Sequence, residues 1–338
     1  MTAVCSALTA LQEGSPVLVV RESGGDVVVP AVLAQPRWTS WAVRHSSGFL
    51  GAPLTGERAD LLALPPMVPQ SPSGASAVAV DAARGVTTGI SAADRARTAR
   101  VLADPGSRPG DLNRPGHVIP LRAQDGGVLA RNGSIEASVD LCRLAGLPPV
   151  ALAATLVTDD GEAASPEQIA VLGETHGHPV VGVADVVAHR LFHGDGIRGR
   201  VTRGEQATVQ SAHGPLTAVG FRDEVTGSEH VALVGPQTGT RAAVAVHVEC
   251  LLGDVFGAAA CTCARRLDGA LCTVAADGGV LIYLRTPATA PLAAAHRWTD
   301  VERGAASAIV KELGLHDAAD LADATEPRVW EPTCQSQS

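Results

Sequence analysis

The chain has 338 residues, of which 46% are hydrophobic and 18% are charged, and its formal net charge is −9. This apolar content is enough for a sizeable core, so global disorder is excluded, and the length predicts two domains of ordinary size. A negative balance without a basic run gives no electrostatic footprint for nucleic acid or for an anionic membrane surface, so we expect neither partner.

Residues 1–16 lack the basic stretch and apolar core of a secretory signal, and no segment has the uninterrupted apolar length of a membrane helix. The sequence therefore predicts a cytoplasmic protein. In that compartment free thiols are expected, and clustered thiols point to a bound metal.

The first half of the chain alternates apolar, β-branched runs with amphipathic segments. The runs that predict strands are 16–20, 27–29 and 76–83. The segments that predict helices are 6–12, 91–103 with Ser91 as the N-cap, and 135–147. The Pro- and Gly-rich stretch 114–121 predicts a loop that leads into an extended segment. This alternation predicts a layered α/β domain.

A glycine-rich and basic composition in 190–203 marks a domain boundary, which we place between residues 197 and 198. Beyond it, alternating apolar residues predict antiparallel strands at 207–219, 230–234 and 242–248. Helices are predicted at 254–260, 265–276 and 301–313. The sequence thus predicts a first domain of residues 1–197 and a β-rich second domain of residues 198–338.

Three of the seven cysteines are grouped, with the spacing Cys250-x10-Cys261-x-Cys263. Three thiolates can hold Zn²⁺ tetrahedrally and leave a fourth position for water or substrate. The alternative is three thiols without a metal in an Ala-rich region, which accounts less well for the grouping. The spacing therefore predicts a zinc site.

The first half has polar residues that suit a phosphorylated ligand. Arg21, Glu22 and Asp26 form a compact loop between two predicted strands. Arg131 precedes a predicted helix, and a guanidinium beside a helix N-terminus suits a phosphate monoester. His117, in the Pro- and Gly-flanked stretch, is a candidate acid or base. Taken singly, each also fits a solvated turn, a surface arginine or a hydrogen-bonded structural histidine.

Longer stretches connect these residues to known families. GVTTGISAADRARTARVLADP and RPGHVIPLRAQDGGVLARNGSIEASVDLCRLAGLPP resemble 3,4-dihydroxy-2-butanone 4-phosphate synthase. GSEHVALV, VHVECLLGDVFGAAACTC and GGVLIYLR resemble GTP cyclohydrolase II. Their order resembles the bifunctional riboflavin-biosynthesis family. The resemblance implies an α/β synthase-like domain followed by an α+β, zinc-containing cyclohydrolase-like domain. Because the synthase site of that family lies at a subunit contact, it also implies a homodimer.

The synthase-like half departs from its family at the metal site. In the family, an acidic loop and a downstream histidine hold Mg²⁺ on ribulose 5-phosphate. The family loop RENEGD is RESGGD in this chain, so Gly24 replaces the second glutamate of the loop. Ser134 occupies the position of the family's metal-binding histidine, and Thr155 occupies the position of a further family glutamate. We therefore do not expect Mg²⁺ in the family's position.

The residues that remain predict a site for a small phosphorylated metabolite. The predicted catalytic residues are His117, Glu22 and Asp26. The predicted substrate-binding residues are Arg21, Arg131 and Ser134. We expect lyase- or isomerase-type chemistry there.

The cyclohydrolase-like half keeps its three zinc cysteines but departs elsewhere. Arg266 occupies the position of the glutamine that recognises guanine in the family. The family segment LRQEGRGIGL is replaced by LRTPATAPLA in this chain. We therefore expect zinc to be kept and GTP cyclohydrolase activity to be lost.

Three functions stay open at this point. The one we favour is a repurposed enzyme that acts on a phosphorylated sugar or a related hydroxy-carbonyl compound. The second is a non-catalytic scaffold or regulator of riboflavin or specialised metabolism. The third is a working 3,4-dihydroxy-2-butanone 4-phosphate synthase, which converts ribulose 5-phosphate to butanone phosphate and formate.

Overall fold

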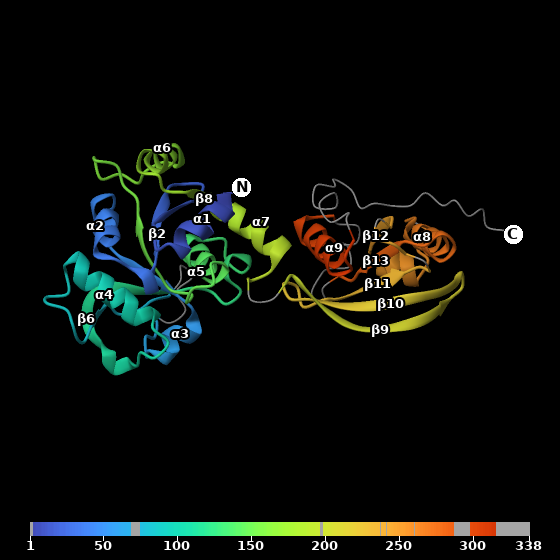
Figure 1. Ribbon diagram of the computed structural model, residues 1–338, viewed down its shortest axis with the longest axis horizontal. Coiled ribbons are helices and arrows are strands. Elements are labelled where there is room, and N and C mark those ends of the chain that lie inside the picture. Colours follow the sequence, from blue (N-terminus) through green and yellow to red (C-terminus); the bar gives the residue numbers. More distant parts are fainter. Residues whose placement is uncertain are drawn as a thin grey trace. The chain divides into compact units, whose positions relative to one another are not determined.

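The computed structural model describes residues 3–68, 75–196, 199–236, 238–240, 242–259, 261–286 and 298–315. The chain divides into two compact units, Met1–His189 and Arg190–Ser338, and the division falls inside helix α7 (Val183–His193) (Figure 1). The predicted boundary between residues 197 and 198 lies outside the described residues. Among the described helices, none is long and apolar enough to cross a membrane.

In the part of the chain that the structure describes, the first unit is built on an eight-stranded sheet with the order β4-β6-β3-β7-β2-β1-β8, and β5 pairs with β6. Its strands are β1 (Val17–Val20), β2 (Gly25–Pro30), β3 (Gly51–Leu54), β4 (Ala75–Ser76), β5 (Val80–Ala82), β6 (Leu112–Arg122), β7 (Ala151–Thr155) and β8 (Val180–Gly182). Its helices are α1 (Ala3–Gln12), α2 (Pro36–Arg44), α3 (Gly56–Leu61), α4 (Ala92–Ala103), α5 (Ser134–Leu144), α6 (Pro166–His176) and the start of α7.

Helices cover both faces of this sheet. Because successive side chains of a strand point to opposite faces, Leu18 and Val27 pack into one core with α2, α3 and α4, whereas Val17 and Val28 pack into a second core with α1, α5 and α7. Burial on both faces explains why these strands read as continuous apolar runs rather than as alternating ones. The layered, mixed α/β architecture is the one that the sequence predicts.

Two local predictions for the first unit have different outcomes. The helix predicted at 91–103 is confirmed as α4, and the Ser91 side chain accepts the Asp94 N–H as its N-cap. The loop predicted at 114–121 is wrong, because this stretch lies inside β6. Its glycine, Gly116, sits beside a register shift against β5, where a Cβ atom would collide with the backbone of Val80.

In the described residues of the second unit, a five-stranded sheet has the order β12-β13-β11-β10-β9. Its strands are β9 (Val201–Ser211), β10 (Gly214–Asp223), β11 (Glu229–Val234), β12 (Val244–Val248) and β13 (Val280–Leu284). Helices α8 (Cys263–Asp277) and α9 (Asp300–Glu312) follow, together with a π-helical turn at Leu251–Val255.

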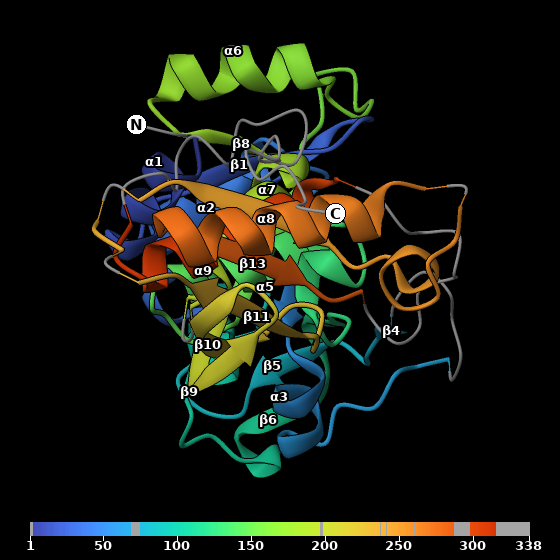
Figure 2. The same cartoon turned by 90° about the vertical axis from the view of Figure 1, so that its right-hand side faces the viewer.

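The two helices pack on opposite faces of the second sheet. Val246 and Ile282 pack against α9, whereas Ala245 and Leu281, their neighbours along the strands, pack against α8. In Figure 1 the β12–β13 pair lies between α9 and α8, and Figure 2 shows α8 in orange alongside β13. His247 and Tyr283 are register partners on these two strands, and their positions two residues beyond Ala245 and Leu281 direct them to the α8 face.

Three predictions for the second unit need correction. The strand predicted at 207–219 is a hairpin of two strands, because the chain turns at residues 212–213. The predicted antiparallel arrangement fails for β12 and β13, which pair in parallel. The helix predicted at 254–260 is wrong over its described part, since the chain forms the π-helical turn there and then leaves the helix, and residue 260 lies outside the described residues. The other two predicted helices are confirmed as α8 and α9.

Candidate functional site

A cavity of about 270 Å³ in the first unit adjoins the N-terminus of α5 and the strands β2, β3, β6 and β7. The polar side chains that line it are Arg21, Asp26, Ser134, Ser138 and Thr155. Three of them are predicted site residues, Arg21, Asp26 and Ser134. A cavity of this size suits a small metabolite.

Strand register brings the carboxylate and a hydroxyl together in this cavity. Asp26 on β2 and Thr155 on β7 are antiparallel register partners, so their side chains share one face. The Thr155 hydroxyl donates a hydrogen bond of 2.7 Å to Asp26 Oδ1. In the sequence, Thr155 stands out only as a lost carboxylate and Ser138 is not among the predicted residues, although its four-residue spacing from Ser134 places both serines on one face of α5.

The other Asp26 oxygen is buried beside the cavity. Asp26 is 6% exposed, and its buried Oδ2 has no hydrogen-bond partner among the described residues. The Arg21 Nε lies 3.4 Å from it, as an ion pair rather than a hydrogen bond. A buried carboxylate oxygen without a donor is costly, so a hydrogen-bond donor supplied to Oδ2 would remove that cost.

Three predicted residues, Glu22, Arg131 and His117, do not line the cavity. Glu22 is exposed in the hairpin turn between β1 and β2, and the left-handed φ of +94° at Gly24 lets this turn close through a bond from the Arg21 N–H to the Gly24 carbonyl. Arg131 instead pairs with the fully buried Glu136, with 2.6 Å between Nη2 and Oε1. Its guanidinium therefore neutralises a carboxylate of α5.

His117 belongs to a second group, on β6. Its Nδ1 lies 2.7 Å from Asp81 Oδ2, and its backbone N–H donates to Asp81 Oδ1 at 3.0 Å. The side chain is 38% exposed, and His117 is not among the cavity-lining residues. A carboxylate that fixes one ring nitrogen leaves the other for proton transfer. Within one chain, the predicted catalytic residues are therefore divided between two places.

The three grouped cysteines converge in the second unit. One ligand atom from each of Cys250, Cys261 and Cys263 lies within 4.8 Å of the others, and within the described ranges this is the group with metal-ligand spacing. The Cys250 and Cys261 sulfurs are 3.9 Å apart, close to the ~3.8 Å expected between two thiolates on one tetrahedral zinc. Burial, followed by the neighbouring Cys250 sulfur, raises the pKa of Cys263 to about 12, so three thiolates together require a cation.

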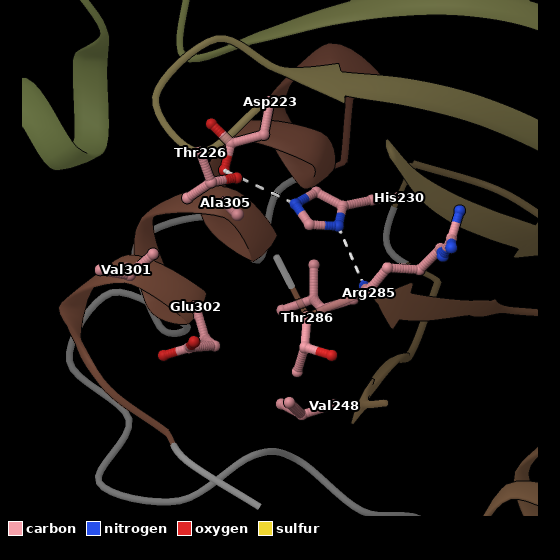
Figure 3. A pocket seen from close by; sticks show the side chains of 10 residues that line it. Asp223, Thr226, His230, Val248, Arg285, Thr286, Val301, Glu302 and Ala305 are labelled. Carbon is pink, nitrogen blue, oxygen red and sulfur yellow. Dashed lines mark hydrogen bonds and ion pairs between the residues drawn. The ribbon is translucent and has the colours of Figure 1, made fainter. Parts of the chain in front are cut away.

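A separate cavity in the second unit is too small for a substrate. It has about 20 Å³ of space, enough for about one water molecule. His230 lies on its wall, where its Nδ1 accepts the Arg285 N–H at 3.1 Å and its Nε2 faces Asp223 Oδ2 at 3.6 Å (Figure 3). The His230 ring therefore lies between the Asp223 carboxylate and the Arg285 backbone.

Asp223 makes the stability of this unit sensitive to acid. Burial alone raises the pKa of this carboxyl, but the adjacent His230 ring and the charge of Arg200 outweigh it and lower the pKa to about 2. Since the unfolded state takes up the proton first as pH falls, a stabilisation of about 2 kcal/mol present above pH ~4 is lost as the pH falls through ~2. Urea unfolding at a series of pH values checks this. The same pH slope in Asp223→Asn would contradict it.

Both units match known families. The model of the 3,4-dihydroxy-2-butanone 4-phosphate synthase family matches residues 5–189, and the model of the GTP cyclohydrolase II family matches residues 202–325. The chain belongs to the riboflavin-biosynthesis family in which these two enzymes are fused. The predicted fusion is therefore confirmed, and both families are enzymatic.

Similar proteins in this family cover most of the chain. The riboflavin biosynthesis protein RibBA of Nocardia farcinica is 44% identical over 291 residues, which are 82% of this chain and 69% of that protein. RibBA of Rhodococcus jostii is 43% identical over 295 residues, which are 82% of this chain and 70% of that protein.

The chain is also similar to solved structures of 3,4-dihydroxy-2-butanone 4-phosphate synthases. RibBX of A. baumannii, a two-domain 3,4-dihydroxy-2-butanone 4-phosphate synthase, is 29% identical with a TM-score of 0.63 and covers 93% of this chain and 91% of its own. The synthase of Candida albicans is 39% identical with a TM-score of 0.53 and covers 56% of this chain and 97% of its own. A further synthase structure, in complex with two magnesium ions, is 38% identical with a TM-score of 0.52 and covers 56% and 96% of the two chains.

Proposed function

We propose that the first unit is an enzyme that acts on a small phosphorylated sugar or a related hydroxy-carbonyl compound in the Asp26 cavity. The observation that carries this proposal is Asp26, which lines a cavity of metabolite size and whose buried Oδ2 has no hydrogen-bond partner among the described residues. The N-terminus of α5 begins at Ser134 on the wall of the cavity. Its outward N–H groups suit the substrate's phosphate.

The proposed step is enolisation of the substrate. Asp26 Oδ2 takes the proton from the carbon beside the carbonyl, the C–H electron pair forms the new C=C bond, and the carbonyl π pair moves onto its oxygen. The Arg21 guanidinium, held beside Asp26, stabilises the negative charge on that oxygen. The hydroxyls of Ser134 and Thr155 bind substrate hydroxyls.

The residues around this cavity do not suit the magnesium site of the family. Among the lining residues, Asp26 is the one carboxylate, and there is no histidine. Its Oδ1 already accepts the Thr155 hydroxyl. Mg²⁺ prefers several well-placed oxygen ligands in octahedral geometry, so the proposed step uses no metal.

The relatives favour ribulose 5-phosphate as the first substrate to test, because they are named as riboflavin-biosynthesis proteins and 3,4-dihydroxy-2-butanone 4-phosphate synthases. Purified protein is incubated with ribulose 5-phosphate in D₂O, with and without Mg²⁺. Formate release at ~1 s⁻¹ or faster, an ordinary enzymatic rate, supports a working synthase and contradicts a repurposed reaction. Exchange of carbon-bound hydrogen without formate supports the repurposed enzyme. Neither signal, across a panel of sugar phosphates, favours the scaffold or regulator.

We also propose that the active form is a homodimer. Within one chain His117 does not line the cavity. Exposed apolar side chains lie both at the cavity and near His117. Phe49 lines the cavity and is 63% exposed. Ile90 is 54% exposed and directly follows Gly89, which packs against His117. Burial of these side chains against a second copy would bring the partner's His117 to the cavity. Light scattering of the purified chain measures the oligomeric state, and a monomer at assay concentration would contradict the dimer.

For the second unit we propose a zinc ion held by Cys250, Cys261 and Cys263, which leaves one tetrahedral position for water or another ligand. We expect about one zinc per chain in protein prepared without chelators, and Cys261→Ser to lower that content, since two thiolates hold zinc much less tightly. Elemental analysis measures both. Cys5→Ser is the matched control, because Cys5 is exposed on α1 in the other unit. Equal zinc in wild type and Cys261→Ser would contradict the site.

Two outcomes remain for GTP. The family match over residues 202–325 favours cyclohydrolase activity, whereas Arg266 at the guanine-reading position predicts its loss. Arg266 is exposed on α8, three residues after the ligand Cys263. Consumption of GTP by the zinc-loaded protein distinguishes the two outcomes.

A further inference from the structure

One carboxylate ties together the elements around the three cysteines. Asp254 lies in the π-helical turn that follows Cys250, and its side chain is 3% exposed. Its Oδ2 accepts the Cys250 backbone N–H at 2.8 Å and the Tyr283 hydroxyl at 2.9 Å. His247 Nε2 lies 3.0 Å from both carboxylate oxygens. The Asp254 N–H donates in turn to the Cys250 carbonyl at 2.7 Å.

These contacts join the cysteine loop to the rigid sheet. His247 on β12 and Tyr283 on β13 are register partners, and their rings stack with centroids 5.4 Å apart. The strands fix both donors, and the donors fix the Asp254 carboxylate. Since the carboxylate holds the Cys250 N–H, the position of the first cysteine depends on the sheet.

The same turn shapes the space between the sulfurs. The Gly253 N–H donates to the Cys250 sulfur at 3.4 Å. A Cβ atom at Gly253 would collide with the Cys261 sulfur and lie 3.1 Å from the Cys250 sulfur. The turn therefore has to pass close to the sulfurs, and a small displacement of its backbone changes their spacing.

We infer that Asp254 is a positioning residue for the metal centre: it holds the Cys250 turn so that the three sulfurs are already spaced for zinc before the ion binds. The inference rests on the proposed zinc site. Asp254 is not itself part of the group with metal-ligand spacing, and both of its oxygens are engaged by donors from the protein. Partners that orient metal ligands in this way typically contribute 10–100-fold in metal affinity.

The test measures zinc affinity of the folded, full-length chain by competition with a chromophoric chelator. Asp254→Asn keeps the size of the side chain but replaces one acceptor oxygen with a donor group, and we expect zinc to bind about 10–100-fold more weakly. Asp268→Asn is the matched control, because Asp268 is 70% exposed on α8 and pairs with His213, not with a cysteine or with Asp254. This control is expected to bind zinc as wild type does.

A second variant keeps the test decisive if Asp254→Asn does not fold. Tyr283→Phe removes one donor to Asp254 without changing any group next to a cysteine, and we expect a smaller weakening of zinc binding. A purely structural role would lower the melting temperature of the metal-free protein and leave the zinc affinity of the folded chain unchanged. That pattern, or wild-type affinity in both variants, overturns the inference. Wild-type protein that binds no zinc would overturn the zinc site itself.

Discussion

Replacement of Asp26 by asparagine is expected to lower turnover by about 10²–10⁴-fold, the usual contribution of a positioned general base. The amide has nearly the same shape and can still accept the Thr155 hydroxyl through its oxygen, so the β2–β7 pairing is kept. It cannot take a proton. The measurement is formate release, or exchange of carbon-bound hydrogen with D₂O, with ribulose 5-phosphate as substrate.

The matched control for this prediction is Glu174→Gln, which removes one carboxylate from an exposed position on α6. We expect its turnover to equal that of wild type. If Asp26→Asn also retains wild-type turnover, Asp26 is not the base and the proposed site is wrong.

The shared site of the proposed dimer permits a second check on the same variant. Asp26→Asn and His117→Ala are each expected to be inactive, but one site of a mixed dimer has both residues intact. Random mixing makes about half of the dimers mixed, and in each mixed dimer one of the two sites has both Asp26 and His117 intact. About one quarter of wild-type activity should therefore return. No recovery in a confirmed mixed dimer would show that His117 does not complete the site of the other copy.

Replacement of Arg200 by methionine is expected to destabilise the second unit by about 3–5 kcal/mol, because it leaves Asp223 buried without its cation. The Arg200 side chain is fully buried, with Nη2 2.8 Å from Asp223 Oδ2. The same guanidinium donates to the Leu191 carbonyl at the end of α7 and to the Val301 carbonyl at the start of α9. Methionine retains the apolar stem but loses all three contacts.

Urea unfolding followed by hydrogen exchange in β10 and β13 measures this loss for the second unit alone. The control is Asp268→Asn, which breaks the exposed His213–Asp268 pair and should cost at most about 1 kcal/mol. Equal effects of Arg200→Met and Asp268→Asn would contradict a special role for the buried pair.

Local sequence patterns predicted several helices and strands correctly. The N-cap at Ser91, the helices α8 and α9, and strand β11 follow from spacing and side-chain type. The patterns failed where neighbouring strands decide the structure. The stretch 114–121 contains residues typical of turns, yet it is a strand because β3 and β5 supply its hydrogen bonds.

The sequence by itself determined the family, the two-unit organisation and the residues that can form the metal group, because motif identity and cysteine spacing are local features. Only the tertiary structure decided which predicted residues meet. The β2–β7 register sets Asp26 against Thr155, while Arg131 turns to Glu136 and His117 to Asp81. In the sequence, Asp254 is only the first residue of a predicted helix, and nothing there indicates a role at the metal group. Its role comes from His247 and Tyr283, which two parallel strands bring to one carboxylate.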